Sequence, residues 1–362
     1  MIKSRKIGGV ERSSNFELMR IILILLIIAH HYVVNSGLTG LYNYTNITAN
    51  MFYLQLFGMF GKTAINGFTL ITGYFMVNKN ITLKKFLKIY LEVKFYYLLF
   101  YLIFLISGYE PFSVKGLVKT VFNICYEAGE QYVGTYVVFF LFIPYLNLLI
   151  KAMSKKQYEY LILLLIIYFT VFSTFMLHET FDFLGWMITM YLIGGYIRLY
   201  PCRLFEKSKT AFYGIIISLV LMVGSVAAID FTGRIMGLES YFFFHDSHKF
   251  LAVTFSVSMF LFFKNIKIYN SRIINTAAAS TFGILLIHAN SNAMRRFLWC
   301  DVFNNISVYN SKYIVLHSVL AVLLVYVVCL VIDMIRITVM EKPLFSKLDK
   351  TDFFNKFNID KE

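Results

Sequence analysis

The sequence predicts an all-α integral membrane protein, a polytopic bundle of about ten transmembrane helices. Of its 362 residues, 59% are hydrophobic and only 15% are charged, whereas soluble domains are about one-quarter charged. Apolar runs close to the roughly 20 residues that cross a bilayer as a helix recur along the chain. Because runs such as 21–29 and 161–168 are continuous rather than alternating, we expect helices and not the short strands of a barrel.

The predicted spans are separated by short polar connections, and no internal repeat or Pro-rich linker divides the chain. They lie near residues 16–36, 51–77, 86–108, 131–151, 158–177, 184–201, 210–230, 248–264, 275–294 and 311–336. We therefore expect one ten-helix membrane domain over residues 1–340, followed by a short polar cytoplasmic tail at 341–362. The first span is too long for the apolar core of a signal peptide, so we expect it to be retained.

Lysine and arginine alternate between the two sets of loops that these spans define. One set, with the terminal segments, carries 24 of the 34 basic residues, and the other set carries seven. Cytoplasmic loops hold the excess of positive charge in membrane proteins, so the count predicts a multi-pass protein of the cell membrane with both termini in the cytoplasm. Since the basic residues are spread over all these loops rather than gathered in one stripe, no nucleic-acid partner is expected.

The first span carries the most informative polar residues. Eleven residues separate Arg20 from His31, so on a helix they lie within about 20° of the same face and about 16 Å apart along the axis. His30 projects about 100° away, toward a neighbouring helix or lipid. Ionisable groups inside a membrane are costly and are often functional, which favours a site along this face. The alternative is that Arg20 snorkels to lipid headgroups and His31 caps the outer end of the helix.

Small residues and lysines mark the junction between the second and third spans. Thr72 and Gly73 allow another helix to approach closely. Lys85 and Lys88 are three residues apart, so both project from one helix face at the cytoplasmic border, where they can hold phosphates. The alternative is that they are ordinary positive charges of a cytoplasmic loop.

Two further charges inside the spans need partners. Glu92 lies four residues after Lys88, which is a spacing at which the two can pair. Lys62 lies near the middle of the second span and carries a desolvation cost unless it faces a polar cavity. We therefore expect such a cavity beside Lys62.

These residues resemble the membrane acyltransferase-3 family, whose signature is Arg-x10-His in the first helix. Arg20 and His31 match that signature at the same spacing. The other matches are residues 70–75, similar to the family's Ser/Thr-Gly-Tyr-Phe; Lys85-x-x-Lys88, where the family has Arg-x-x-Arg; residues 282–288, similar to Phe-Gly-Ile-Tyr-Leu-Ile-His; and the landmarks at 144–147 and 194–196. The resemblance runs in order from about residue 15 to residue 343.

The resemblance implies a membrane O-acyltransferase that moves an acetyl or other acyl group from cytoplasmic acetyl-CoA to a hydroxyl of a cell-surface or exported polysaccharide. Arg20, Lys85 and Lys88 would bind the CoA phosphates, and His31 would be catalytic, as a general base or as a transient acyl carrier. Candidates for substrate binding or support are His30, Lys62, Thr72, Glu92 and His288. His288 either orients the acceptor or the base, or is a structural histidine in a helix interface.

Acetyl-CoA is then a substrate, and no metal is expected because the four cysteines show no ligand spacing. The implied partners are the polysaccharide acceptor outside the cytoplasm, membrane lipid and the polysaccharide-synthesis machinery. Two positions depart from the family pattern. Lysines replace the arginines of Arg-x-x-Arg, so phosphate binding there would rest on point charge rather than a bidentate fork. Gln131 stands where the family often places an aromatic residue, so the acceptor side is expected to differ.

A transporter or exporter of polysaccharide or lipid-linked glycan, without acyl-transfer chemistry, is the alternative function. Transporters often contain repeats and spans broken near the midplane. The sequence shows no repeat, and Pro144 is the only proline well inside a predicted span. A purely structural partner of a polysaccharide synthase would not explain Arg20, His31 and the lysine pair together. The sequence therefore favours an enzyme.

Overall fold

The computed structural model describes residues 13–79, 81–232, 237–351 and 353–354, which form helices and turns with no strand among them. The basic segment 1–12 and the tail 355–362, on which part of the charge argument rests, lie outside the described residues. The helices are α1 Ser14–Val34, α2 Ala49–Gly58, α3 Gly61–Met76, α4 Leu83–Ile106, α5 Val114–Val121, α6 Asn123–Glu127, α7 Tyr132–Ala152, α8 Lys155–Ile166, α9 Phe172–Phe175, α10 Phe183–Leu199, α11 Ser208–Phe231, α12 Phe250–Asn265, α13 Arg272–Ala278, α14 Thr281–His288, α15 Asn292–Arg296, α16 Ile314–Arg336 and α17 Lys342–Asp349. A π-helical turn, Ile337–Glu341, joins α16 to α17, so this helix continues past residue 340.

The structure confirms an all-α protein with several membrane-spanning helices, but it does not confirm the count of about ten. Among the described residues, six helices are long and apolar enough to cross a membrane, or seven if one bent pair is counted as a span. The apolar helices α10 and α12 have only 17 and 16 residues, which is short of the roughly 20 that a span needs.

Two of the predicted spans are broken helices. The span predicted at 51–77 is divided between α2 and α3, and the span predicted at 275–294 bends by 93° between Arg272–His288 and Asn292–Val302. These breaks were not evident from the sequence, because no proline lies at either point: residues 58–61 are Gly-Met-Phe-Gly and residues 289–291 are Ala-Asn-Ser. The lack of broken spans therefore no longer counts against the transporter alternative.

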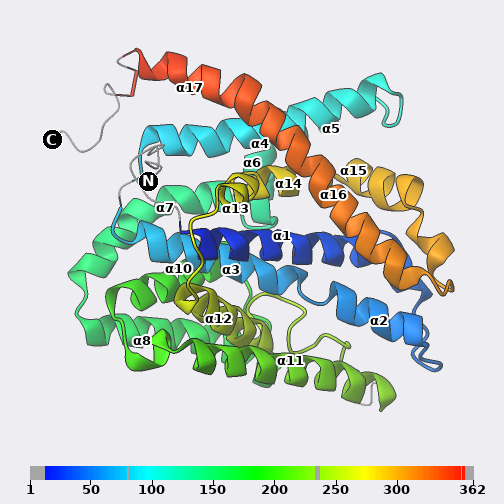
Figure 1. The fold of residues 1–362 in the computed structure, drawn as a ribbon, viewed down its shortest axis with the longest axis horizontal. Coiled ribbons are helices and arrows are strands. Elements are labelled where there is room, and N and C mark those ends of the chain that lie inside the picture. Colours follow the sequence, from blue (N-terminus) through cyan, green and yellow to red (C-terminus); the bar gives the residue numbers. More distant parts are fainter. Residues whose placement is uncertain (1–12, 80, 233–236, 352, 355–362) are drawn as a thin grey trace.

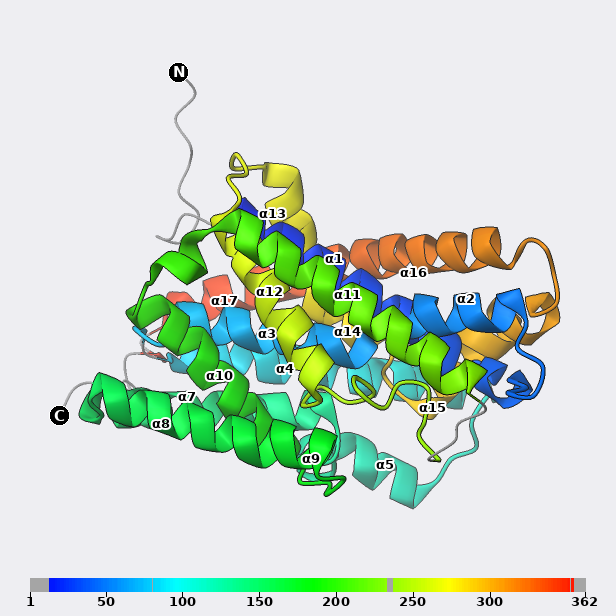
Figure 2. The same cartoon turned by 90° about the horizontal axis from the view of Figure 1, so that it is seen from below.

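α1 lies in the middle of the bundle (Figure 1). α3 runs beside it, α16 crosses it on one side, and α11 and α12 lie on the other side. The connections α3–α4, α7–α8 and α10–α11 lie at the end of the bundle where α1 begins, whereas the α1–α2 connection lies at the opposite end (Figures 1 and 2). The lysine-bearing loops thus share one end of the molecule, as expected for helices that alternate in direction.

The outer surface of α16 is suited to lipid. Its exposed side chains include Leu316, Leu320, Leu323, Leu324, Val327, Val331 and Ile335, while its charged residues Asp333 and Arg336 are buried. A continuous apolar face of this kind indicates contact with a membrane or another protein rather than with water. α16 therefore exposes apolar side chains and buries charged ones, the reverse of a helix in a soluble bundle.

His30 and two glycines produce the break between α2 and α3. His30 Nδ1 lies 2.7 Å from the carbonyl oxygen of Gly58, the last residue of α2, and donates a hydrogen bond to it. A Cβ atom at Gly61, the first residue of α3, would lie 2.2 Å from His30 Cγ. The ring thus occupies the space that a side chain at position 61 would need. His30 faces a neighbouring helix end, and not lipid.

α3 and α10 pack with their backbones in close contact, which explains two of the glycine landmarks. A Cβ atom at Gly73 would lie 2.3 Å from the carbonyl oxygen of Tyr191, and one at Gly194 would lie 2.4 Å from a carbonyl oxygen of α3. Asn147 of α7 closes the same end of α3: its amide donates to the carbonyl of Met76 at 2.9 Å, and its Oδ1 accepts from the Tyr191 hydroxyl at 2.6 Å. These residues therefore hold α3, α7 and α10 against one another.

Gly73→Ala is expected to destabilise the protein by about 3 kcal/mol, because overpacking a tight interface costs 1–3 kcal/mol and two helix backbones must separate here. Gly224→Ala in α11 is the matched control, since no atom lies within 4 Å of a Cβ there; it should be neutral or gain up to about 1 kcal/mol from helix propensity. Thermal unfolding of both variants in detergent measures the difference. Equal unfolding temperatures would contradict the close α3–α10 packing.

Candidate functional site

Two adjoining cavities lie beside α1. The first, the Arg20 cavity, has a volume of about 210 Å³ and is lined by Arg20, Ile24, Phe68, Thr72, Ile89, Glu92, Tyr132, Tyr136, Ala278, Ala279, Thr281, Phe282 and Leu285. The second, the His31 cavity, has a volume of about 330 Å³ and is lined by Ile27, His30, His31, Val34, Asn35, Gly61, Lys62, Ile65, Tyr97, Glu127, Glu130, Gln131, Tyr132, Val133, Phe183, Leu285, Leu286, Ala289, Asn290 and Arg295. Because Tyr132 and Leu285 line both, the two cavities meet.

One stripe of α1 connects the two cavities. Arg20 and Ile24 line the first cavity, and Ile27 and His31 line the second. These positions recur at intervals of four, three and four residues, which is the period of one helix face. The eleven-residue spacing of the sequence thus places Arg20 and His31 along a continuous path of roughly 16 Å.

His31 and His288 form a hydrogen-bonded pair whose tautomers are defined by a backbone carbonyl. His288 Nδ1 lies 2.6 Å from the carbonyl oxygen of Ile284, which can only accept, so Nδ1 carries the proton and neutral His288 has a bare Nε2. This Nε2 lies 3.0 Å from His31 Nδ1, which must therefore donate. Neutral His31 then keeps its own Nε2 free of a proton, on a ring that lines the cavity.

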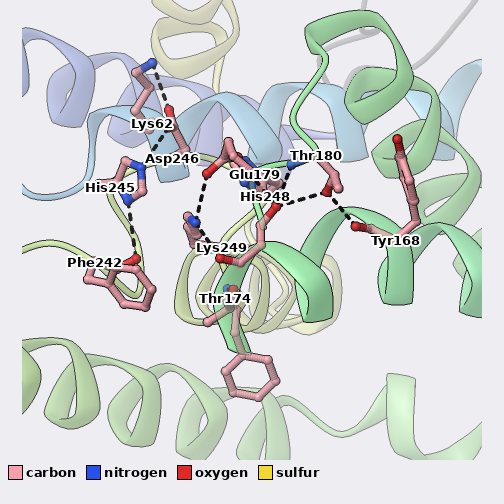
Figure 3. A network of polar contacts seen from close by, with 12 residues as sticks. Lys62, Tyr168, Thr174, Glu179, Thr180, Phe242, His245, Asp246, His248 and Lys249 are labelled. Carbon is pink, nitrogen blue, oxygen red and sulfur yellow. Dashed lines mark hydrogen bonds and ion pairs between the residues drawn. The ribbon is translucent and has the colours of Figure 1, made fainter. Parts of the chain in front are cut away.

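Lys62 faces the polar cavity that its position in the sequence requires, and it is held there by a carboxylate. Its Nζ lies 3.1 Å from Asp246 Oδ1, and Asp246 Oδ2 lies 3.1 Å from His245 Nε2 (Figure 3). Burial alone would raise the pKa of Asp246, but the His245 hydrogen bond and the Lys62 charge hold it well below its usual range. Asp246 therefore stays ionised and neutralises Lys62.

A second group of charges lies beside this pair and ties two loops together. Glu179, in the loop before α10, lies 3.1 Å from Lys249 Nζ and 2.7 Å from His248 Nε2, both in the segment before α12 (Figure 3). Lys249 also donates to the carbonyl of Ser173 at 2.8 Å. The Lys249 and His248 side chains are almost fully buried, so the cluster fixes this loop pair beside the His31 cavity.

At the Arg20 end, the structure rearranges the expected ion pairs. Glu92 does not pair with Lys88; its Oε1 accepts from Arg336 at 2.9 Å, and Lys88 Nζ lies 2.8 Å from Glu341. The reason is that α16 and α17 pack against α4 and bring a buried arginine to the face that Glu92 shares. Arg20 Nη1 lies 3.3 Å from Glu17 Oε1, which is a long contact for an ion pair, and about a third of the Arg20 side chain is exposed.

The candidates Thr72, Lys85 and Lys88 lie differently with respect to the Arg20 cavity. Thr72 lines it, and its hydroxyl donates to the carbonyl of Phe68 at 2.9 Å. Lys85 and Lys88 are not among its lining residues; Lys85 is exposed and Lys88 half-buried in the first two turns of α4, ahead of the lining residue Ile89. The two lysines lie beyond the cavity rather than within it.

The sequence analysis missed three polar residues of the His31 cavity. Asn35 Nδ2, Asn290 Nδ2 and Arg295 Nε are buried and have no hydrogen-bond partner among the described residues. Glu127 lines the same cavity, and its Oε1 accepts from the Tyr97 hydroxyl at 2.6 Å. Arg295 could have been singled out as one of the few basic residues in the sparse set of loops, whereas nothing in the local sequence marks the asparagines.

The fold and the site define a multi-pass membrane protein with a hydrogen-bonded histidine pair in a polar cavity and a cationic group at the other end of the same helix. Residues 13–334 match the family Acyl_transf_3, described as an acyltransferase domain. The match covers most of the chain, so the chain belongs to this acyltransferase family. No curated protein and no solved structure matches the chain.

Proposed function

We propose that the protein is a membrane O-acyltransferase that transfers an acetyl or related acyl group from cytoplasmic acetyl-CoA to a hydroxyl of a cell-surface or exported polysaccharide. The observation that carries the proposal is the His31–His288 pair, which leaves an unprotonated His31 Nε2 in a cavity connected along α1 to Arg20. A neutral imidazole with a bare ring nitrogen can accept a proton from a hydroxyl.

The donor enters from the Arg20 end in this proposal. The phosphates of CoA lie against Arg20, Lys85 and Lys88, and the pantetheine arm follows the stripe of Ile24 and Ile27 toward His31. Arg20 supports this placement because its guanidinium is only loosely paired with Glu17, at 3.3 Å, and so can donate to a phosphate. The lysines would act as point charges at the entrance.

The chemical step uses His31 as the general base. The sugar O–H gives its proton to His31 Nε2 while the hydroxyl oxygen forms a bond to the thioester carbonyl carbon. The C–S bond then breaks, and the departing thiolate recovers the proton from His31. His31 Nδ1 donates to His288 throughout, so the positive charge of the intermediate imidazolium is shared with a hydrogen-bond acceptor. An acyl-His31 intermediate is the second route, and it requires the same free Nε2.

The proposed orientation places the protein in the cell membrane with its amino and carboxyl termini in the cytoplasm. It rests on the excess of lysine and arginine in the connections that share the end where α1 begins. The acceptor polysaccharide then reaches the His31 cavity from the opposite side, near membrane lipid and the machinery that makes the polymer.

The function is tested by mass spectrometry of surface polysaccharide from cells with and without the gene, together with transfer of label from acetyl-CoA in isolated membranes. Acyl groups should disappear from the glycan of the deletion strain while the polymer remains at the surface. Loss of the polymer itself, with no acyl transfer in membranes, would instead indicate the transporter alternative, which the division of α2 from α3 and the bend between α14 and α15 also suit.

Arg20→Ala is expected to raise the KM for acetyl-CoA by about tenfold or more, because a charge-assisted hydrogen bond to phosphate is worth roughly 1.5–3 kcal/mol. The double variant Lys85→Gln and Lys88→Gln should raise it less, since Lys88 is already paired with Glu341 at 2.8 Å. Lys151→Gln, an exposed lysine at the end of α7, is the control. If the KM for acetyl-CoA equals that of the control in both variants, these residues do not bind the donor and serve only as positive charges on the cytoplasmic side.

A further inference from the structure

We propose that the His31 cavity is a subsite for an uncharged sugar ring, with Asn35, Asn290 and Arg295 donating hydrogen bonds to its hydroxyl oxygens. This inference rests on the proposed function and specifies its acceptor. The acylated sugar would be a neutral hexose or N-acetylhexosamine rather than a uronic acid.

The unpartnered donors are the reason to expect a ligand here. Asn35 follows the end of α1, Asn290 lies between α14 and α15, and Arg295 lies on α15, so three segments direct free N–H groups at one space. Asn290 is 9% exposed, and a buried donor without a partner is destabilising. The volume of about 330 Å³ lies within the usual range of small-molecule sites, about 300–1,000 Å³.

The surrounding charges argue against an anionic sugar. Arg295 already donates through Nη2 to the carbonyl of Ala289 at 3.2 Å and through Nη1 to Asn292 Oδ1 at 3.3 Å. These two contacts already use two of the five N–H groups of the guanidinium. Glu127 and Glu130 line the same cavity, and their charge would repel the carboxylate of a uronic acid.

Lys62, the other cation of the cavity, is neutralised by Asp246 at 3.1 Å. No cation lining the cavity among the described residues is thus fully free for a uronic acid. A neutral sugar fits because each hydroxyl both donates and accepts: its oxygens accept from Asn35, Asn290 and Arg295, and a neighbouring hydroxyl donates to Glu127. A further hydroxyl of the ring then meets His31 Nε2.

Asn290→Leu removes the buried donor at similar volume and is the direct test. Membranes carrying each variant receive labelled acetyl-CoA and surface polysaccharide from the same cells, stripped of its acyl groups by mild alkali. We expect the acceptor KM to rise about tenfold with the donor KM unchanged, and Asn290→Ser, which keeps a donor, to recover part of the loss. Asn46→Leu, an exposed asparagine in the connection before α2, should behave as wild type.

The position of the acyl group in the native polysaccharide gives a second, independent test. Two-dimensional NMR of the isolated glycan identifies the sugar that carries it, and a neutral sugar is expected. An acyl group on a uronic acid, or an acceptor KM unaffected in Asn290→Leu, would overturn the subsite while leaving acyl transfer intact. If wild-type membranes transfer no acyl group at all, the proposed acyltransferase function is wrong, and the proposal of an acceptor subsite is then wrong as well.

Discussion

His31→Ala is expected to lower the rate of acyl transfer by about 10² to 10⁴, with the protein present in the membrane at normal abundance. The size follows from the loss of a general base, which contributes a factor in this range. The residue can be removed without dismantling the fold because its ring lines a cavity and, among the described residues, its one side-chain hydrogen bond is to His288, at 3.0 Å. The measurement is the acyl content of isolated surface glycan, normalised to immunoblotted protein.

His30 provides the control for this experiment, since it is adjacent in sequence and also borders the cavity. Its Nδ1 donates to the carbonyl of Gly58 at the break between α2 and α3, so its role is to support the backbone. His30→Asn keeps a donor near the position of Nδ1 and should retain most activity. A ring larger than imidazole at position 30 would clash with the backbone of Gly61. The contact is already so close that a Cβ atom at position 61 would lie 2.2 Å from His30 Cγ. Near wild-type acylation by His31→Ala would rule out the mechanism proposed here.

The sequence predicted the helical membrane class, the family and the path along α1, because each depends on periodic or local information. Composition determines whether a chain belongs in lipid, and helix geometry determines which side chains of one helix share a face. Arg20 and His31 therefore line adjoining cavities at the spacing that the sequence shows. The small residues near Gly73 likewise mark a helix contact, although the sequence does not say that α10 is the partner.

The helix count and the charge pairs could not be predicted in the same way. The break between α2 and α3 requires the ring of His30 from another helix, and no local pattern contains that information. Glu92 is spaced correctly for Lys88, but its partner is Arg336, 244 positions away. Long-range packing decided both cases, because a buried carboxylate takes the partner that the tertiary fold brings to it.

His288→Leu is expected to reduce kcat by about 10² while leaving both KM values nearly unchanged. Leucine cannot accept the proton of His31 Nδ1, so His31 is free to rotate or to adopt the tautomer that places the proton on Nε2, where it blocks proton transfer. The partners that orient metal-ligating histidines contribute factors of 10 to 100, and we expect an effect at the upper end of that scale for His31. His288 is thus a positioning residue, which acts on the sugar hydroxyl only through His31.

His288→Gln separates this role from a structural one. The amide oxygen of glutamine can accept from His31 Nδ1, which lies 3.0 Å from His288 Nε2 in the native pair, so this variant should recover most of kcat. Single-turnover acyl transfer in membranes, with protein abundance measured in parallel, gives the comparison. Equal loss of activity in the leucine and glutamine variants at normal abundance would mean that the histidine does more than fix the tautomer. Full activity in both would mean that His31 needs no partner to present its Nε2, and the hydrogen-bonded chain from Ile284 would then have no part in catalysis.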